Sequence, residues 1–483
     1  MTTFYQFAAI LLIIYSICVS LIGINSPLGE GHHGFILGEK ARPAIYWLRF
    51  GVIETKFGQL VNTEWELGKE KYNYNVHHPI GLPILIYLSF KTIGISEFSA
   101  RLPVIFINVF SLVFFYLLVR NLFSERVATL SLFFFVFSPM FFYMRNFVST
   151  EVFSLLFIFI VLYFYVNYVN TGKRKYLFSS AMFFFLGTFL SDWWVYFVLP
   201  IVVVHRIIYF KRKDTLFFIP ISIISFSFYL LHVYIITGSL IGEGSHMGSL
   251  IERLLFRLNL SEESWSYGIT FQSLLASIFE NAKKFFTHTV LSLSLISLVL
   301  FKNVRNKEIG FLLISSISLS SILLIFSNIT WIHDFFVLFL IFPIALFPSL
   351  FLLSLNASIK ERTLLIIVTI ILFLSEASHA YIKIHQWFTN SPPIVKFVAE
   401  NPGNFLVTYY ENPDYHQFRF YSDLRKVKMV RNRGELLNEI KSGDYNYIIT
   451  MPDRLESKEL LLYLRENYRS KVISHEYEVF FLK

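Results

Sequence analysis

"HHPIGLPILIYLSFKTIG", residues 77–94, decides how the chain is threaded through a membrane. The segment offers only about fifteen apolar residues, interrupted by Gly81 and Pro83, whereas a helix that crosses a bilayer needs about twenty. Its length and its proline favour a short helix that lies on the membrane surface. We therefore predict an external juxtamembrane helix here, because counting it as a span would reverse the orientation of every later loop.

Apolar segments surround this stretch on both sides. The chain has 483 residues, of which 55% are hydrophobic and 16% charged, and its mean hydropathy is +0.57, which is typical of a polytopic membrane protein. The first segment has no small-residue cleavage site behind it, so we expect a retained helix and not a signal peptide. About eleven segments have the length and apolarity of spans: 4–24, 103–119, 127–143, 150–169, 177–191, 194–209, 215–236, 285–301, 309–327, 335–353 and 363–380.

Basic residues predict the orientation of these spans. Alternate short loops, at 120–126, 173–175, 211–214, 302–308 and 360–362, hold 13 Lys or Arg. The loops between them, at 144–149, 192–193 and 328–334, hold only Arg145. This asymmetry places the N-terminus in the cytoplasm and the 25–102 loop, the 237–284 loop and the C-terminal tail outside. Because the basic residues form short runs between apolar segments, they indicate no nucleic-acid partner.

The composition becomes that of a soluble domain from about residue 385. "NFLVTYY" (404–410), "KVKMV" (426–430) and "YNYIITMP" (445–452) resemble strands, and a final pair of strands is expected over 471–482. Helical patterns separate them at 413–421, 433–441 and 455–467. The predicted fold is an α-helical polytopic membrane domain, residues 1–384, followed by a small, largely parallel α/β extracytoplasmic domain, residues 385–483. Without a Gly-rich phosphate fingerprint, the second domain is interpreted as a lid or docking platform.

Histidines occur with carboxylates in the predicted external segments, in "LGEGHHGFILGE" (28–39) and "EGSHMG" (243–248). A helix at 30–33 would place Glu30 and His33 on one face. Imidazole and carboxylate suit a zinc-like ion, or Mn²⁺ where carboxylates dominate, although no fixed spacing such as HExxH occurs. The alternative is that these histidines are polar anchors in the headgroup zone. The candidates are Glu30, His32, His33, His77, His78, Glu243 and His246.

The single cysteine, Cys18, lies inside the first apolar segment, so neither a disulfide nor a thiolate metal site is available. In "IERLLFRL" (251–258), apolar residues recur at helical spacing. We expect an interfacial helix there, with Arg253 and Arg257 near lipid phosphates.

Ionisable residues also stand at the predicted outer ends of spans. Such groups cost several kcal/mol at membrane depth unless they are paired, so they mark functional cavities. Asp192 and Asp334 could instead cap the helices that follow them, and Arg145 could extend toward the headgroups. The residues concerned are Arg145, Glu151, Asp192, His333 and Asp334.

The order of these features resembles the GT-C superfamily of polyprenyl-phosphate-dependent glycosyltransferases, in particular protein O-mannosyltransferases and lipid A aminoarabinose transferases. The resemblance rests on "EKARPAIYWLRFG" (39–51), "HHPIGLPILIYLSFKTIGISEFSARLP" (77–103), "RNLFSER" (120–126) and "SPMFFYMRNFVSTE" (138–151). It covers roughly residues 4 to 200 and implies an α/β-type domain outside the membrane.

The resemblance also implies roles for single residues. The essential acid of the first external loop, an Asp in the family, corresponds to Glu30 or, as the alternative, Glu39. The second acid corresponds to Glu151. In the aminoarabinose transferases a metal bridges the segment before the proline motif and a histidine of the long loop, which points to His77 or His78 with His246. A divalent ion (Zn, Mn or Mg) is therefore an expected cofactor, with His33 as a further candidate ligand.

The chemistry of such a transfer fits the residues. A carboxylate must take the acceptor proton, and positive groups must hold the departing phosphate. Glu30 is the candidate base, and Arg42, Arg49 and Arg145 are the candidate phosphate ligands. We predict transfer of a sugar from a polyprenyl-phosphate donor to a lipid, glycan or protein acceptor. A lipid-linked oligosaccharide transporter, a glycan polymerase or ligase, and an inactive scaffold of the same fold stay open as alternatives, although the spans show no internal repeat typical of transporters.

Overall fold

The computed structural model describes residues 2–29, 32–60, 74–243, 245, 248–300, 306–355, 358–389, 391–401, 403–408, 420, 427–430, 433–452, 458–474 and 477–482. The chain divides into two compact units. The helical unit comprises residues 1–24, 76–82 and 102–385, and the mixed unit comprises residues 25–75, 83–101 and 386–483.

Eight helical segments among the described residues are long and apolar enough to cross a membrane. They are Thr3–Leu21, Glu97–Leu122, Thr150–Thr171, Trp193–Phe210, Phe218–Thr237, Lys307–Ile325, Asp334–Ser354 and Lys360–Gln386. A ninth is added if the bent pair Phe271–Phe286 and His288–Leu300 counts as one span. The multi-pass membrane fold is therefore confirmed.

Three predicted spans take a different form. The 127–143 segment divides into α5 (Glu125–Val136) and α6 (Pro139–Met144), because Ser138 caps a new helix that begins at Pro139. The 177–191 segment forms α8 (Arg174–Leu190), which has 17 residues. The 285–301 segment forms α14 (His288–Leu300), which has 13 residues and follows a sharp bend. A proline preceded by a capping serine divides the first of these segments and a sharp bend shortens the last, and neither is visible in average hydropathy.

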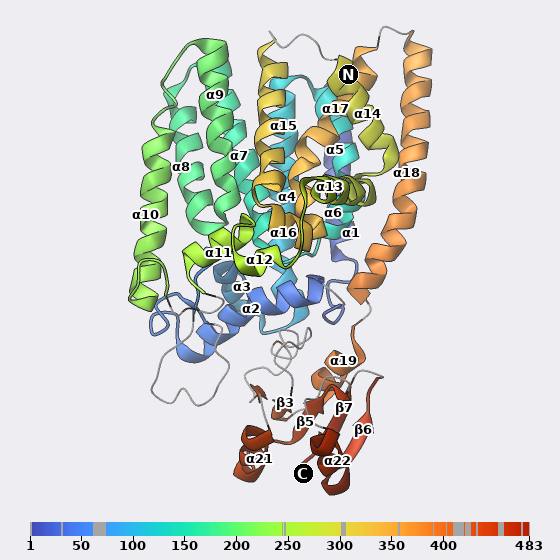
Figure 1. Ribbon diagram of the computed structural model, residues 1–483. Helices are drawn as coiled ribbons and strands as arrows, with labels where there is room; N and C mark the ends of the chain where they lie inside the picture. The colour runs from blue at the N-terminus through green and yellow to red at the C-terminus, as the bar shows by residue number, and fades with distance from the viewer. Residues whose placement is uncertain are drawn as a thin grey trace. The chain divides into compact units, whose positions relative to one another are not determined.

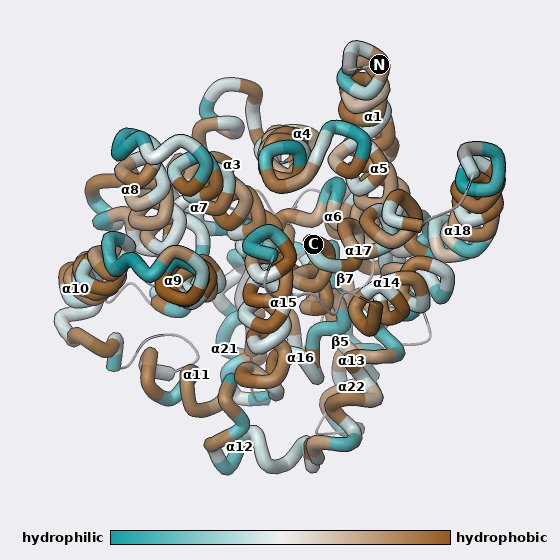
Figure 2. Tube along the Cα trace, turned by 90° about the horizontal axis from the view of Figure 1, so that it is seen from above, coloured by the Kyte–Doolittle hydropathy of each residue, from teal (hydrophilic) through white to brown (hydrophobic). Residues whose placement is uncertain are grey.

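The helical unit is a layered bundle with α7 (Thr150–Thr171) and α17 (Ile341–Ser354) largely buried. Figure 1 shows α7, α8, α9 (Val198–Phe210) and α10 (Phe218–Thr237) side by side. In contrast, α1 (Thr2–Leu21), α10 and α18 (Ile359–Thr389) are mostly exposed and apolar, as Figure 2 shows for α10 and α18. These outer helices present the surface that lipid would cover.

Two further helices of this unit are spans, α4 (Glu97–Leu122), whose first residues belong to the mixed unit, and α15 (Lys307–Ile325). The segments η1 (Trp193–Phe197) and η2 (Asp334–Leu340) begin the spans that α9 and α17 complete. The shorter helices are α11 (Leu250–Arg257), α12 (Glu262–Trp265), α13 (Phe271–Phe286) and α16 (Ser327–Ile332). The loops after α7 and α9 and the first turn of α18, which carry basic residues, lie at one end of the unit, the upper end in Figure 1. The α6–α7 junction and α16 lie toward the other end.

The mixed unit contains α2 (His32–Phe50), a short antiparallel pair of strands, β1 (Gln59–Leu60) and β2 (Tyr74–Asn75), and most of α3 (Gly81–Ile93). With 13 residues, α3 is too short to cross a bilayer, so the short helix predicted for 77–94 is confirmed. The indole ring of Trp47 on α2 packs edge-on against Tyr87 on α3, with ring centroids 6.1 Å apart.

The C-terminal part of the mixed unit is the predicted α/β layer. Its sheet has the order β4-β3-β5-β7-β6, formed by β3 (Phe405–Val407), β4 (Val427–Met429), β5 (Tyr447–Thr450), β6 (Arg469–Val472) and β7 (Glu478–Phe481). β3 pairs in parallel with β4 and β5, whereas β7 pairs antiparallel with β5 and β6. The sheet is therefore mixed, and not largely parallel as predicted, because the last two strands form a hairpin.

Alternating side chains of β3 bury both faces of this sheet. Phe405 and Val407 pack with α19 (Pro393–Glu400), and Leu406 packs with α21 (Arg433–Ser442) and α22 (Lys458–Asn467). The predicted helix at 433–441 is thus confirmed, and so is the described part of the one at 455–467, from Lys458 on. The one at 413–421 lies outside the described residues apart from Phe420.

Candidate functional site

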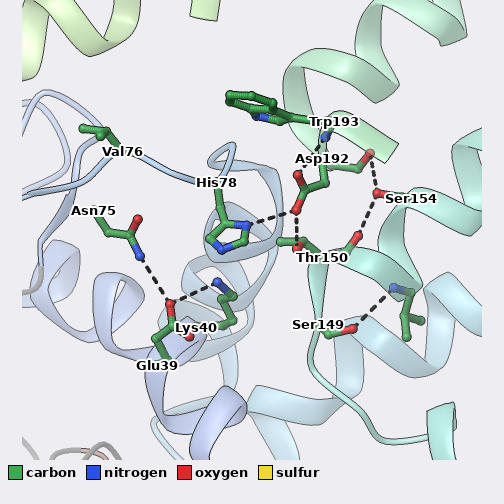
Figure 3. Close-up of polar contacts among 12 residues, drawn as sticks. Glu39, Lys40, Asn75, Val76, His78, Ser149, Thr150, Ser154, Asp192 and Trp193 are labelled. Carbon is green, nitrogen blue, oxygen red and sulfur yellow. Dashed lines mark hydrogen bonds and ion pairs between the residues drawn. The ribbon is translucent and has the colours of Figure 1, made fainter. Parts of the chain in front are cut away.

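A buried carboxylate, Asp192, is the centre of a polar cluster in the helical unit. Its side chain is 0% exposed. Oδ1 accepts the backbone N–H of Trp193 at 2.7 Å and so caps η1, which is the alternative that the sequence left open for this residue. Oδ2 accepts the Thr150 hydroxyl at 2.6 Å and lies 3.0 Å from Nδ1 of His78 (Figure 3). Asp192 is therefore both a helix cap and the group that orients a predicted metal or site histidine.

The local sequence explains why these groups converge. Ser149 has extended backbone and caps α7, so Thr150 and Glu151 occupy its first turn. The Ser154 hydroxyl, one turn later, donates to Ser191 at 3.3 Å and joins α7 to the residue before Asp192. On the other side, a Cβ at Gly81 would lie 2.3 Å from the carbonyl oxygen of Leu190. Only glycine permits this close approach, which brings the His78 segment against the end of α8.

The charges around Asp192 favour its ionised form. Burial alone would raise the pKa of this carboxyl, but His78, Arg257 and the Thr150 hydroxyl together hold it below its ordinary value. Arg257 is the last residue of α11, a helix that begins with a capping box formed by Ser249 and Glu252. The predicted helix at 251–258 is thus confirmed, and it supplies an arginine that acts on the cluster.

His77 faces the second predicted histidine segment. Its Nε2 lies 3.1 Å from the carbonyl oxygen of Gly248, two residues after His246. Burial, and then the charges of Arg257, His78 and Arg253, lower the pKa of His77 to about 3. The neutral ring therefore donates Nε2–H to the carbonyl, and Nδ1 carries no proton, which is the form a metal ligand requires.

The predicted metal site is only partly described by this geometry. The 77–78 and 248 segments meet, as the expected pairing requires, but His246 itself lies outside the described residues. Across the described ranges, no group of three His, Cys, Asp or Glu side chains is arranged to hold an ion. Nδ1 of His78 is bound to Asp192, and His33 is buried on α2 in the mixed unit. A divalent ion is therefore an unconfirmed expectation.

A second cluster adjoins the start of α7. Glu151 is nearly buried, and the pKa of Tyr143 on α6 is raised well above its usual value by burial and then by the charges of Asp334 and Glu151. Asp334 does not cap η2, as one alternative predicted, but forms an ion pair with Lys284 from α13. His333 precedes Asp334, and the centroid of its ring lies 5.2 Å from the centroid of the Phe335 ring.

Arg145, a predicted phosphate ligand, is fully buried after α6 and does not extend to the surface. Its guanidinium carbon lies 3.5 Å from the ring centroid of Phe142, and Tyr15 and Tyr381 are near enough to influence its charge. Burial lowers its pKa to about 10, so the side chain stays cationic at neutral pH. This aromatic environment can hold a cation in place.

The other predicted residues belong to the mixed unit. Arg42 is buried on α2, and burial lowers the pKa of Arg49, whose guanidinium lies 5.2 Å from the Phe50 ring. Oε1 of Glu39 accepts Lys40 Nζ at 3.1 Å and Asn75 Nδ2 at 3.3 Å (Figure 3). Glu30 lies outside the described residues.

Arg101, in the motif "ARLP", fixes the chain just before Glu30. Its Nη1 donates to the carbonyl oxygen of Ser26 at 2.5 Å, and its Nη2 to that of Pro27 at 3.5 Å. The sequence alone predicted neither this contact nor a role for Thr150, Tyr143 or Lys284. For Thr150, a local signal was present in the helix-capping pattern Ser149-Thr150-Glu151.

Comparisons with known proteins agree with this architecture. Residues 77–235, which include the Asp192 cluster apart from Arg257, match the family model described as dolichyl-phosphate-mannose-protein mannosyltransferase. A search of curated proteins finds no match.

Solved structures match most of the chain. ArnT from Cupriavidus metallidurans bound to undecaprenyl phosphate is 12% identical, with 98% of each chain covered and a TM-score of 0.60. The Archaeoglobus fulgidus oligosaccharyltransferase complexed with Zn and sulfate is 12% identical, with 92% of this chain and 68% of that chain covered and a TM-score of 0.56. AglB from the same organism, with an inhibitory peptide and a dolichol-phosphate, is 12% identical over 93% of this chain and 70% of that chain, with a TM-score of 0.54. The resemblance to the GT-C superfamily is confirmed, and the chain has its fold.

Proposed function

We propose that the protein transfers a sugar, with inversion, from a polyprenyl-phosphate donor to a lipid, glycan or protein acceptor at the outer membrane face. A membrane glycosyltransferase in general is supported by the matching family and fold. The donor class is suggested by the lipid phosphates bound to ArnT and AglB. The observation that carries the proposal is the buried Asp192–His78–Thr150 cluster with Arg257 beside it.

The orientation follows from charge. The end of the helical unit with the basic loops is assigned to the cytoplasm, so the Asp192 cluster belongs to the outer end. A cysteine at Thr171, which ends α7, should be protected from an impermeant thiol reagent, and one at Ser442 should be labelled. Labelling of Thr171→Cys from outside intact cells would reverse this orientation. Both variants need Cys18 replaced by Ser, because that thiol is exposed.

The leaving phosphate needs positive charge. Arg257 acts electrostatically on both Asp192 and His77. It is therefore closer to this cluster in its effect than Arg145, whose guanidinium lies over the Phe142 ring. An arginine fork matches phosphate oxygens in two hydrogen bonds. We assign Arg257 to the donor phosphate, and keep Arg42, Arg49 and Arg145 as further candidates. A divalent ion held by His77 and His246 would add positive charge to the same region.

The transfer step needs one base. The acceptor hydroxyl oxygen bonds to the anomeric carbon, the bond from that carbon to the phosphate oxygen breaks, and the electron pair leaves with the polyprenyl phosphate. The hydroxyl proton passes to a carboxylate. Glu30 is the proposed base, in the loop that Arg101 fixes at Ser26. Glu151 and Glu39 are the alternative acids.

The test compares Glu30→Gln, Glu151→Gln and Glu39→Gln with the parent protein on a panel of lipid-linked sugars. General-base catalysis is worth about 10² to 10⁴ in rate, so Glu30→Gln should fall to roughly a thousandth of the parent rate. Glu30→Asp should keep part of the activity. If Glu151→Gln or Glu39→Gln loses activity and Glu30→Gln does not, the base is misassigned.

The panel itself is chosen by comparing lipids and glycans from cells with and without the protein by mass spectrometry. One missing sugar should identify donor and acceptor. If the purified protein instead moves lipid-linked sugars across proteoliposome membranes with no transfer, and none of the three acids matters, the enzyme interpretation is wrong.

A further inference from the structure

A sharp break separates α13 from α14. The two helices meet at Thr287 with a bend of 116°. Thr287 has a positive φ of +68° with a ψ of 157°, a backbone conformation that a β-branched residue rarely adopts, and its side chain is buried. Such a conformation is strained and persists only where neighbouring contacts hold it.

Glu376 of α18 makes such contacts. Its Oε2 accepts the backbone N–H of Thr289 at 3.0 Å, and its Oε1 accepts the Thr289 hydroxyl at 2.9 Å. The carboxylate thus caps the start of α14 from a different helix, where the helix dipole favours negative charge. A carboxylate inside a membrane span is costly unless it is bound, and Glu376 lies in the Lys360–Gln386 span.

The rest of α14 is fixed to α17. The hydroxyl of Ser294 donates to the carbonyl of Ile344 at 3.3 Å, and that of Ser297 to the carbonyl of Phe347 at 2.9 Å. Because α14 is anchored along its length and at its start, the break determines where α13 lies.

The end of α13 reaches the candidate site. Lys284, three residues before Thr287, pairs with Asp334. The next residue, Phe285, packs against Tyr143 with ring centroids 5.2 Å apart. Burial and then the charges of Asp334 and Glu151 raise the pKa of Tyr143. A shift at the break would therefore move the cation that is paired with Asp334, a carboxylate of the second cluster.

We propose that Glu376 is a positioning residue, which holds the α13–α14 break and thereby keeps Lys284 beside Asp334. The effect of Glu376 on turnover rests on the proposed function, whereas its effect on the position of Lys284 does not.

The first test measures position without activity. Cysteines replace Lys284 and Asp334 in full-length protein with Cys18→Ser, and a short bis-maleimide joins them. Glu376→Ala should reduce the cross-linking yield several-fold. Glu376→Gln should preserve it, because the amide oxygen can accept the Thr289 N–H while its NH₂ donates to the hydroxyl. Unchanged cross-linking in Glu376→Ala would overturn the proposal.

Glu361 provides a matched control on the same helix. It lies in the first turn of α18 and accepts the Ser358 N–H, just before that helix, at 2.9 Å. Glu361→Ala removes a comparable cap far from the break in sequence and should leave the cross-linking unchanged. An equal loss in both alanine variants would show a general loosening of α18, and would also overturn the proposal.

The second test uses activity in the native Lys284 background. Glu376→Ala should lower kcat about 10- to 100-fold with KM for the donor changed less than threefold, since a displacement of about 1 Å can cost 10²-fold in rate. Combined with Lys284→Ala, it should cause no further loss, because both act through one cation. Additive losses would contradict the positioning role. If the protein shows no transfer at all, the cross-linking result still decides the structural part.

Discussion

Two aspartates near opposite ends of the helical unit show how differently a carboxylate can be held. Asp192 is enclosed and bound by a histidine, a hydroxyl and one backbone N–H. Asp214, between α9 and α10, accepts Nε and Nη2 of Arg206 at 2.8 and 2.9 Å and also the Tyr168 hydroxyl, and its side chain is 32% exposed. An arginine fork stays charged at all working pH values, whereas an imidazole can gain or lose a proton. The Asp214 cluster therefore suits a structural clamp between α7 and α9, and the Asp192 cluster suits chemistry.

The largest effect is expected from Asp192→Asn, which tests whether the two aspartates differ in role. In one orientation the Asn amide places its NH₂ group where Oδ2 accepts hydrogen bonds from Thr150 and His78. In the other orientation the NH₂ group faces the Trp193 N–H, and the cap of η1 is lost. We expect turnover to fall at least about 100-fold, with membrane insertion retained, measured as transfer rate per detergent-purified protein. Retention of most activity would place Asp192 with Asp214 as a structural group.

A weaker effect is expected from Arg257→Gln. Loss of the guanidinium should raise KM for the lipid-phosphate donor about 10- to 100-fold, because one charge-assisted contact to phosphate is worth roughly 1.5–3 kcal/mol. Arg253→Gln is the matched control on the same helix, since Arg253 faces the exposed Glu263 at 3.8 Å. Equal KM values for both variants would remove Arg257 from the donor site.

The smallest effect is expected from Asp214→Asn, and it should be on stability. This variant should keep turnover within about twofold and lose about 1 kcal/mol, as partly exposed ion pairs do. The hydrogen bonds from Arg206 lower the pKa of Asp214 from 3.8 to about 2. Because the pKa of Asp214 is lower in the folded protein, the ionised carboxylate stabilises the fold fully at pH values above the ordinary pKa of 3.8. This stabilisation is lost as the pH falls through about 2. Thermal unfolding between pH 5 and 2 should therefore show the parent approaching Asp214→Asn as the pH falls, and parallel curves would contradict the clamp.

Much of the architecture follows from local pattern. The short helix at 77–94, the helix at 251–258 and the strands of the C-terminal sheet are all where periodicity places them. The broken 127–143 and 285–301 segments were less predictable, because each break depends on one or two residues, a capping serine before a proline and a threonine with positive φ, while hydropathy averages over many.

The sequence by itself determined that the chain is a multi-pass membrane protein with an α/β layer at its C-terminus, because apolarity and side-chain periodicity are properties of consecutive residues. It also marked Asp192, Glu151 and Asp334 as unusual, since charge near a membrane span is costly wherever it is later placed. Only the tertiary structure decided their partners. His78 and Asp192 are 114 residues apart, and Lys284 and Asp334 are 50 apart. Which side chains meet over such separations depends on how the helices pack around Gly81 and bend at Thr287, and no local preference encodes that.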